Sequence, residues 1–285
     1  MRFAYIGSAL AIAALMGCAR LGAQQTQPPG GEQSVAGPAG AIYVDDGGGS
    51  GKEGLPVVFL HSFGGDSGHW ATPLSHVRHH RRALAIDLRG HGKSAAPAQD
   101  DYAVEAFARD VEAVVDKLRL RRFVLVGHSL GGAVAAKYAA ANPNRVAGLV
   151  LVGAPGKIPA EQSAQILAAL ESNYDATMKG YWEKLFTGAQ PHVRTQLAAQ
   201  IGQVPKDTTL AIIAALFKDD PLASIDRYPG PKLVIYTPQG DTPNDLQNVR
   251  PNIPRKLMPG TSHWPHLDRP REFNEVLEEF LATVK

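Results

Sequence analysis

The stretch Phe123–Gly132, which reads FVLVGHSLGG, decides the fold of this chain. Its first four residues are apolar and partly β-branched, a composition typical of a buried strand. Residues 133–141 are small and rich in alanine, which favours a helix packed closely on a sheet. Between them, Gly127 and Gly131 flank Ser129 in the pattern G-x-S-x-G, and both glycines leave room for a sharp turn. The turn would hold the Ser129 hydroxyl at the positive end of the helix, where a nucleophile is favoured.

The alternation of strand and helix extends along most of the chain. Apolar runs predict strands at residues 41–45, 56–60, 82–86, 146–152, 232–236 and within 251–258, and helical patterns lie at 70–79, 104–118 and 270–284. This order is typical of an α/β fold with a mostly parallel sheet covered by helices on both faces. Because sites in such sheets lie beyond the carboxyl ends of the strands, the loops after residues 60, 87, 126 and 152 should line one rim.

A serine hydroxyl is a weak nucleophile, so it needs a base within hydrogen-bond reach. Among the ten histidines, His263 has the best context. It lies in the run 260–270, GTSHWPHLDRP, after the last predicted strand and before the last helix. His263 is therefore the candidate base, whereas we expect His266 to be structural and His128 to pack beside the turn.

These runs together resemble the α/β-hydrolase superfamily from about residue 41 to residue 285. Residues 127–131 resemble its nucleophile elbow and 260–270 its catalytic-histidine loop; 61–65 (HSFGG) and 87–94 (DLRGHGKS) match two further family motifs. The resemblance implies a helical cap at about residues 156–228, where the strand rhythm stops. Four helical runs are plausible there, at 160–172, 174–186, 192–202 and 207–218.

The resemblance also implies the donors that would stabilise a tetrahedral oxyanion, namely the backbone N–H groups of Leu130 and Phe63. Ser62 stands where the family usually has glycine, and it would be strained if that position required a positive φ. The run 87–94 should tie down a tight loop without taking part in chemistry.

The orienting acid of the histidine is expected in the loop after the seventh strand of the family. Asp241 fits best, about one residue away from the common spacing, and Asp245 is the alternative. Such a carboxylate would hold the tautomer of His263 and stabilise the imidazolium. An aspartate that only caps its own turn is the competing interpretation.

Two tryptophans, Trp70 and Trp182, are candidate substrate-binding residues. The resemblance implies that Trp70 forms part of the pocket floor, and a core residue that opens a helix is the alternative. The cap aromatics could form an acyl pocket, or else bury the cap's own helices; they are Tyr174, Tyr181, Trp182, Phe186 and Phe217.

Composition excludes several classes of function. The 285-residue chain has a formal net charge of +2, so no strongly basic surface argues for nucleic acid. No histidine or acidic cluster has metal-ligand spacing, and no phosphate-binding glycine motif occurs with its lysine. We therefore expect neither a metal nor another cofactor.

The N-terminus has the features of an export signal. Residues 1–19 combine a positive start, an apolar run and small residues around Cys18, the only cysteine. This pattern predicts a bacterial lipoprotein anchored through a lipid on Cys18, with cleavage after Ala19 or Ala23 as the soluble alternative. Residues 20–40 should be a flexible linker to a domain at 41–285. The protein should be periplasmic or membrane-anchored, or else secreted.

These observations predict a serine hydrolase that cleaves a small-molecule carboxylic ester, or a related acyl compound, through an acyl-enzyme on Ser129. C–C bond hydrolysis and a perhydrolase activity like that of the non-haem haloperoxidases remain alternatives at the same residues. A lipoprotein that uses the fold only as a binding module is a further alternative.

Overall fold

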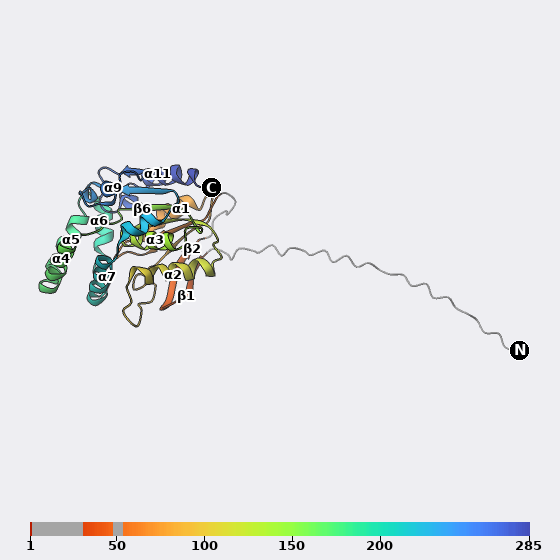
Figure 1. Cartoon of the computed structure of the whole chain (residues 1–285), viewed down its shortest axis with the longest axis horizontal. Coiled ribbons are helices and arrows are strands. Elements are labelled where there is room, and N and C mark those ends of the chain that lie inside the picture. Colours follow the sequence, from red (N-terminus) through yellow and green to blue (C-terminus); the bar gives the residue numbers. More distant parts are fainter. Residues whose placement is uncertain (2–30, 48–53) are drawn as a thin grey trace.

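A computed structural model describes residues 1, 31–47 and 54–285 of the chain (Figure 1). The predicted lipid site Cys18, the rest of the predicted signal segment beyond Met1, and the predicted linker up to residue 30 lie outside the described residues. Within the described ranges, no helix combines the length and the apolar character needed to cross a bilayer.

The described residues form one sheet of eight strands in the order β1-β2-β4-β3-β5-β6-β7-β8. The strands are β1 (Gly31–Gly37), β2 (Gly40–Asp46), β3 (Val57–Leu60), β4 (Ala83–Ile86), β5 (Phe123–His128), β6 (Val146–Val152), β7 (Lys232–Tyr236) and β8 (Arg255–Leu257). The pairs β1–β2 and β2–β4 are antiparallel, and all pairs from β4 to β8 are parallel. The predicted α/β fold with a mostly parallel sheet is therefore confirmed.

Helices cover both faces of the sheet because side chains alternate along its buried strands. In β3, Val57 and Phe59 join an apolar cluster with residues of α1 and α11, whereas Val58 and Leu60 join the cluster with residues of α2 and α3. Figure 1 shows α11 and α2 on opposite sides of the sheet. These and the shorter helices are η1 (Ser67–Trp70), α1 (Ala71–Val77), α2 (Val104–Lys117), α3 (Leu130–Ala141), η2 (Pro238–Gly240), α9 (Leu246–Val249), α10 (Pro265–Asp268) and α11 (Pro270–Thr283).

The first strand departs from the sequence-based expectation. Residues 31–40 were expected to belong to a flexible linker, and this is wrong: β1 pairs with β2 from Gly31 opposite Asp46 to Gly37 opposite Gly40. Val35 is buried and α2 packs on the strand. The composition of the segment is that of a linker, so only the pairing and the burial of one side chain reveal the strand.

A group of helices separates β6 from β7, where a cap was expected. They are α4 (Ala160–Ser172), α5 (Tyr174–Leu185), α6 (Pro191–Ala198), α7 (Lys206–Lys218) and α8 (Pro221–Arg227). The first four match the four helical runs expected from the sequence, and Figure 1 shows them gathered at one end of the sheet. In contrast, α8 packs on α3, in the helical layer of the sheet.

The loop after β4 is held by buried charges. The two carboxylate oxygens of Asp87 accept hydrogen bonds from the N–H groups of Ser67 at 2.6 Å and Lys93 at 2.8 Å. The Arg89 guanidinium donates to both carboxylate oxygens of Asp110 at 2.5 and 2.7 Å, and both side chains are 2% exposed. The expectation that this motif ties down a tight loop agrees with these contacts.

Because the ion pair between Arg89 and Asp110 is buried, truncation of Arg89 should destabilise the fold strongly. Arg89→Ala leaves a buried carboxylate without its counter-charge, so the free energy of unfolding should fall by about 3–5 kcal/mol. Urea denaturation measures this loss. Arg109→Ala is the matched control, because the Arg109 side chain is 56% exposed and its ion pair with Asp101 should contribute about 0–1 kcal/mol. Equal losses in the two variants would contradict the prediction.

Candidate active site

Ser129 occupies a strained turn between β5 and α3. Its φ of 51° and ψ of −114° are rare for a residue with a side chain, and such conformations cost about 1–3 kcal/mol. The flanking glycines make the turn possible. A Cβ on Gly127 would lie 2.2 Å from the carbonyl oxygen of Gly131, and a Cβ on Gly131 would lie 2.5 Å from that of Leu60. The backbones at the turn therefore approach too closely for any other residue.

The Ser129 side chain lies on the wall of a cavity of about 190 Å³. The cavity runs between the rim of the sheet and helices α4, α5 and α7, and most of its lining is apolar. The lining includes Phe63, Leu130, Ala133, Pro155, Ile158, Ile166, Leu170, Met178, Tyr181, Ile213, Leu216 and Phe217. A half-buried hydroxyl is thus presented to a space suited to an apolar group.

Two backbone N–H groups near Ser129 are available as donors. Leu130 is the first residue of α3, so its N–H has no acceptor within the helix. The N–H of Phe63 has no hydrogen-bond partner among the described residues. The two segments are joined, since the N–H of Gly131 donates to the carbonyl oxygen of His61 at 3.2 Å. The arrangement suits an oxyanion hole, which needs donors already in place.

Ser62 is accommodated without strain. The positive φ in this loop, 72°, falls on Gly64, and Ser62 is not among the residues with positive φ. The buried Ser62 hydroxyl instead accepts a hydrogen bond from Trp264 Nε1 at 3.3 Å. His61 Nε2 accepts from the N–H of Leu88 at 2.9 Å, which leaves Nδ1 to donate to the Ser62 carbonyl at 2.7 Å. Ser62 therefore links this loop to the loop of His263.

Neighbouring residues connect the loop of His263 to the turn of Ser129. The N–H of Ser129 donates to the carbonyl oxygen of Val152 at 2.9 Å, and a Cβ on the next residue, Gly153, would lie 3.1 Å from His263 Cε1. The ring of His128 lies 4.8 Å from that of His263, and its Nε2 donates to the His263 carbonyl at 2.8 Å. His128 thus packs beside the turn, as expected, and also supports the loop of His263.

The imidazole of His263 is desolvated and has a free nitrogen. Burial lowers the pKa of His263 to about 4. Its Nε2 is buried and has no hydrogen-bond partner among the described residues, so the bond to Ser129 Oγ is not formed in this structure. The backbone N–H of His263 donates to the carbonyl oxygen of Leu185, the last residue of α5, at 3.1 Å. The cap and His128 therefore hold this loop in place.

The structure does not bring Asp241 to His263. Asp241 is exposed, and its Oδ1 accepts a hydrogen bond from Asn248 Nδ2 at 2.9 Å. The alternative, Asp245, accepts from the N–H of Thr242 at 2.7 Å and precedes α9. A neighbouring carboxylate would raise the pKa of an imidazole, whereas burial is the cause found for His263. Both aspartates therefore act here as turn residues.

The two candidate tryptophans have different places. Trp70 is fully buried, stacks on His266 at 4.2 Å and packs on Phe59. It lines neither the cavity next to Ser129 nor the one next to Trp182, and its place in a pocket floor stays a prediction. His266 is accordingly a core residue, as expected. Trp182 stacks on Phe63 at 5.8 Å and lines a second cavity, of about 360 Å³, between α5 and α6.

The sequence interpretation missed the aliphatic lining of the cavity next to Ser129. Of the five cap aromatics considered, Tyr181 and Phe217 line this cavity, whereas the other three line the second one. Asp219 also lines it and pairs with Lys137 Nζ at 2.5 Å. Aliphatic residues on amphipathic helices give no signal of a pocket, because the same pattern serves a helix that packs on the core.

Comparisons with known proteins identify the family of the chain. Residues 57–276 match the model of the alpha/beta hydrolase family. The dihydrolipoyllysine-residue acetyltransferase component of the acetoin cleaving system of Pseudomonas putida is 36% identical over 47% of the chain and 35% of its own length. A non-heme chloroperoxidase of Streptomyces lividans is 38% identical over 43% of the chain and 49% of its own length. The chain thus spans half or less of the length of these two relatives.

Among solved structures, Est816, described as an N-acyl homoserine lactone degrading enzyme, has a TM-score of 0.75 and is 26% identical. The match covers 87% of this chain and all of that one. Esterases, peroxidases and C–C hydrolases all occur among the similar proteins.

The pKa of His263 predicts an unusual pH dependence. The imidazole acts as a base only when neutral, and with a pKa of about 4 it stays neutral well below the ordinary value of 6.5. The kcat/KM should therefore stay constant from pH 7 down to about 5 and fall only as the pH passes about 4. Circular dichroism at each pH separates this loss from unfolding. A midpoint near 6.5 in the folded protein would contradict the prediction.

Replacing Asp241 tests the missing carboxylate. Where a triad depends on its acid, the change to an amide lowers kcat about 10⁴-fold. Because Asp241 contacts Asn248 and not His263, Asp241→Asn should keep kcat within about threefold of the parent, like its matched control Asp245→Asn. A loss of several orders of magnitude in Asp241→Asn alone would show that the loop 237–245 moves onto His263 during turnover.

Proposed function

Because the chain belongs to the alpha/beta hydrolase family, we propose that it is a serine hydrolase that cleaves carboxylic esters. One observation carries the proposal: a serine in the strained elbow conformation faces an apolar cavity. On the neighbouring loop, the Nε2 of His263 has no hydrogen-bond partner in the part of the chain that the structure describes. A hydroxyl in this setting is suited to attack a carbonyl rather than to stabilise a fold.

The proposed reaction has two stages. In the first, Ser129 Oγ attacks the acyl carbon while His263 Nε2 takes the hydroxyl proton, and the N–H groups of Leu130 and Phe63 stabilise the oxyanion. The C–O bond to the leaving group then breaks, and His263 returns the proton to the departing alcohol. In the second stage, His263 takes a proton from water, whose oxygen attacks the acyl carbon. The bond from that carbon to Ser129 Oγ then breaks, His263 returns the proton to Oγ, and the carboxylic acid leaves. No cofactor is needed.

The position of His263 in this scheme depends on packing rather than on an acid. Its backbone is fixed at both ends, by Leu185 and by His128, and its ring contacts His128 and Trp264. We assign Asp241 no direct contact with the base in the resting enzyme. The low pKa of His263 fits this assignment, since a carboxylate partner would raise it.

The cavity favours an apolar acyl group. Its aliphatic lining offers few polar partners, so a chain of several carbons gains more from burial there than an acetyl group does. A small cavity also limits the length that fits.

A peroxide-dependent activity is the second candidate. The similarity to a non-heme chloroperoxidase favours it, and the same serine, histidine and oxyanion donors would serve it. C–C bond hydrolysis is the third, favoured by similarity to a hydrolase of that class. Bromination of a dye in the presence of peroxide, measured beside ester hydrolysis, separates the first two activities.

We also propose export, with a lipid on Cys18 that anchors the protein to a membrane. The sequence around Cys18 supports this proposal. Mass spectrometry of the mature N-terminus would reveal the lipid, whereas cleavage after Ala19 or Ala23 would give a soluble protein without Cys18.

Ser129→Ala should abolish ester hydrolysis. The substitution removes the nucleophile from a folded site, so kcat for p-nitrophenyl esters should fall at least about 10³-fold. A fluorophosphonate probe should label Ser129 in the parent and leave the variant unlabelled. Among p-nitrophenyl esters, butyrate and hexanoate should exceed acetate in kcat/KM. Ser163→Ala is the control, because this buried serine of α4 is not among the residues that line the cavity, and its hydroxyl donates to the carbonyl oxygen of Ala160. Retained turnover or labelling in Ser129→Ala would refute the proposal.

A further inference from the structure

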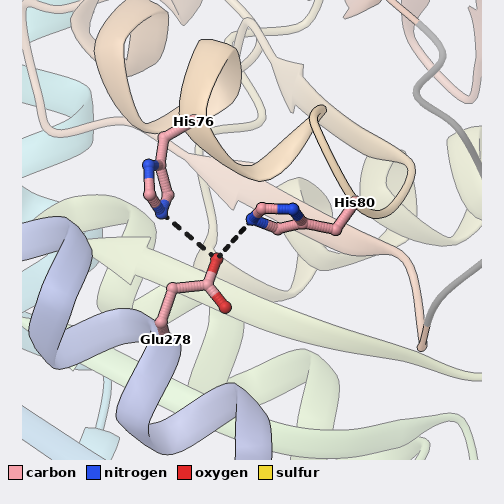
Figure 2. A group of neighbouring side chains, drawn as sticks. All are labelled: His76, His80 and Glu278. Atoms are coloured by element: carbon pink, nitrogen blue, oxygen red, sulfur yellow. Dashed lines mark ion pairs between the residues drawn. The ribbon is translucent and has the colours of Figure 1, made fainter.

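Three side chains that could bind a metal meet where α1 faces α11, away from the cavity of Ser129. His76 lies in the last turn of α1, His80 follows in the next turn, and Glu278 comes from α11 (Figure 2). Glu278 Oε1 lies 3.4 Å from His76 Nε2 and 3.9 Å from His80 Nε2. Figure 2 shows both imidazoles directed toward this oxygen. The three ligand atoms all lie within 4.8 Å of one another.

Two of these three atoms are buried without a hydrogen bond. His76 Nε2 and Glu278 Oε1 are both inaccessible to water and form no hydrogen bond among the described residues, although they lie within ion-pair distance of each other. Buried polar atoms are normally satisfied, and an exception calls for a physical explanation such as a missing ion. The residues themselves are only partly buried, with side chains 30–42% exposed, so an ion could reach the group from solvent.

The distances suit a small tetrahedral ion. Ligands held about 2.0–2.2 Å from a tetrahedral zinc ion lie about 3.4 Å apart. His76 and Glu278 already have this separation, at 3.4 Å. His80 Nε2 lies slightly too far from Glu278 Oε1, at 3.9 Å, and a small rotation of the partly exposed His80 side chain would close the gap. Two imidazoles and one carboxylate form a ligand set that zinc accepts, with water in the fourth position.

We propose that His76, His80 and Glu278 bind one divalent transition-metal ion of the zinc type. The ion would join α1 to α11, two helices on the same face of the sheet that are about 200 residues apart in sequence. Because an unfolded chain does not keep these three ligands together, binding would stabilise the folded state. The role is structural, since the site shares no residue with the cavity of Ser129.

A neighbouring arginine affects both the orientation of Glu278 and the affinity of this site for a cation. Arg81 Nη2 lies 3.9 Å from Glu278 Oε2, the carboxylate oxygen that faces away from the imidazoles. The contact orients the carboxylate with Oε1 toward His76 and His80, although the positive charge of Arg81 weakens cation binding. The ring of His79 lies 6.3 Å from that of His80, and His79 is not among the three ligands.

The competing account is a simple ion-pair cluster in which Glu278 binds protonated histidines and Arg81. The two accounts predict different responses to metal. An ion-pair cluster gives a stability that depends on pH and salt but not on zinc, whereas a metal site gives one that rises with zinc concentration.

The experiment uses the full, untagged chain after treatment with a chelator and gel filtration. Zinc affinity is measured by competition with a chromogenic chelator, and the melting temperature is followed as zinc is added. Cobalt serves as a second probe, because tetrahedral Co²⁺ absorbs strongly in the visible range. We expect one ion per chain, a rising melting temperature and the tetrahedral cobalt spectrum. His76→Ala, His80→Ala and Glu278→Gln should each weaken zinc binding at least about tenfold.

His79→Ala is the matched control, since it removes a neighbouring histidine that is not a ligand. It should keep the affinity of the parent within about twofold. Ester hydrolysis should be unchanged in all four variants, and Cys18 is present in each of them. The proposal is overturned if zinc binding is not stoichiometric, if His79→Ala weakens it as much as His76→Ala does, or if all variants bind like the parent.

Discussion

The close approach of three backbone segments at the turn after β5 is the constraint on which the rest of the site depends. The carbonyl oxygen of Leu60 lies so near Gly131 that no side chain fits at Gly131. The carbonyl oxygen of Gly131 excludes a side chain at Gly127 in the same way. This crowding forces Ser129 into a conformation that costs about 1–3 kcal/mol. The parallel strands on either side of β5, which are buried on both faces, offset that cost. The strain is what directs the hydroxyl out of the sheet.

The other parts of the site are linked to this turn by hydrogen bonds rather than by sequence proximity. Ser62 accepts from Trp264, and the residue before Trp264 is the candidate base, His263. The N–H of His263 donates to Leu185 in the cap. His69 Nε2 shares a hydrogen bond with Gln200 Oε1 at 2.7 Å, which fastens the cap to the loop after β3. The cavity, the base and the oxyanion donors therefore keep their relative positions as one unit.

The opposite face of the sheet serves stability. Trp70 stacks on His266 there, Phe273 packs against both rings at tilted angles, and α1 and α11 pack against each other beside them. Burial lowers the pKa of His266 well below its ordinary value, and that of His61 to about 3. Histidines that are buried in the neutral form oppose protonation, so stability is full above about pH 6.5 and is lost as the pH falls toward these low values. A metal between α1 and α11 would strengthen this same layer.

The sequence by itself determined the fold, most element positions and the elbow turn, because these follow from local patterns. Period-two and period-3.6 apolar runs place the strands and helices, and two glycines around a serine specify a turn. Tertiary structure alone decided the rest. Strand β1 has the composition of a linker, and only its pairing with β2 makes it a strand. Asp241 has nearly the spacing of the family's acid, yet its side chain contacts Asn248. His76 lies beside Glu278 although the two are far apart in the sequence. These outcomes depend on which surfaces meet when the helices pack, and no local pattern encodes such long-range contacts.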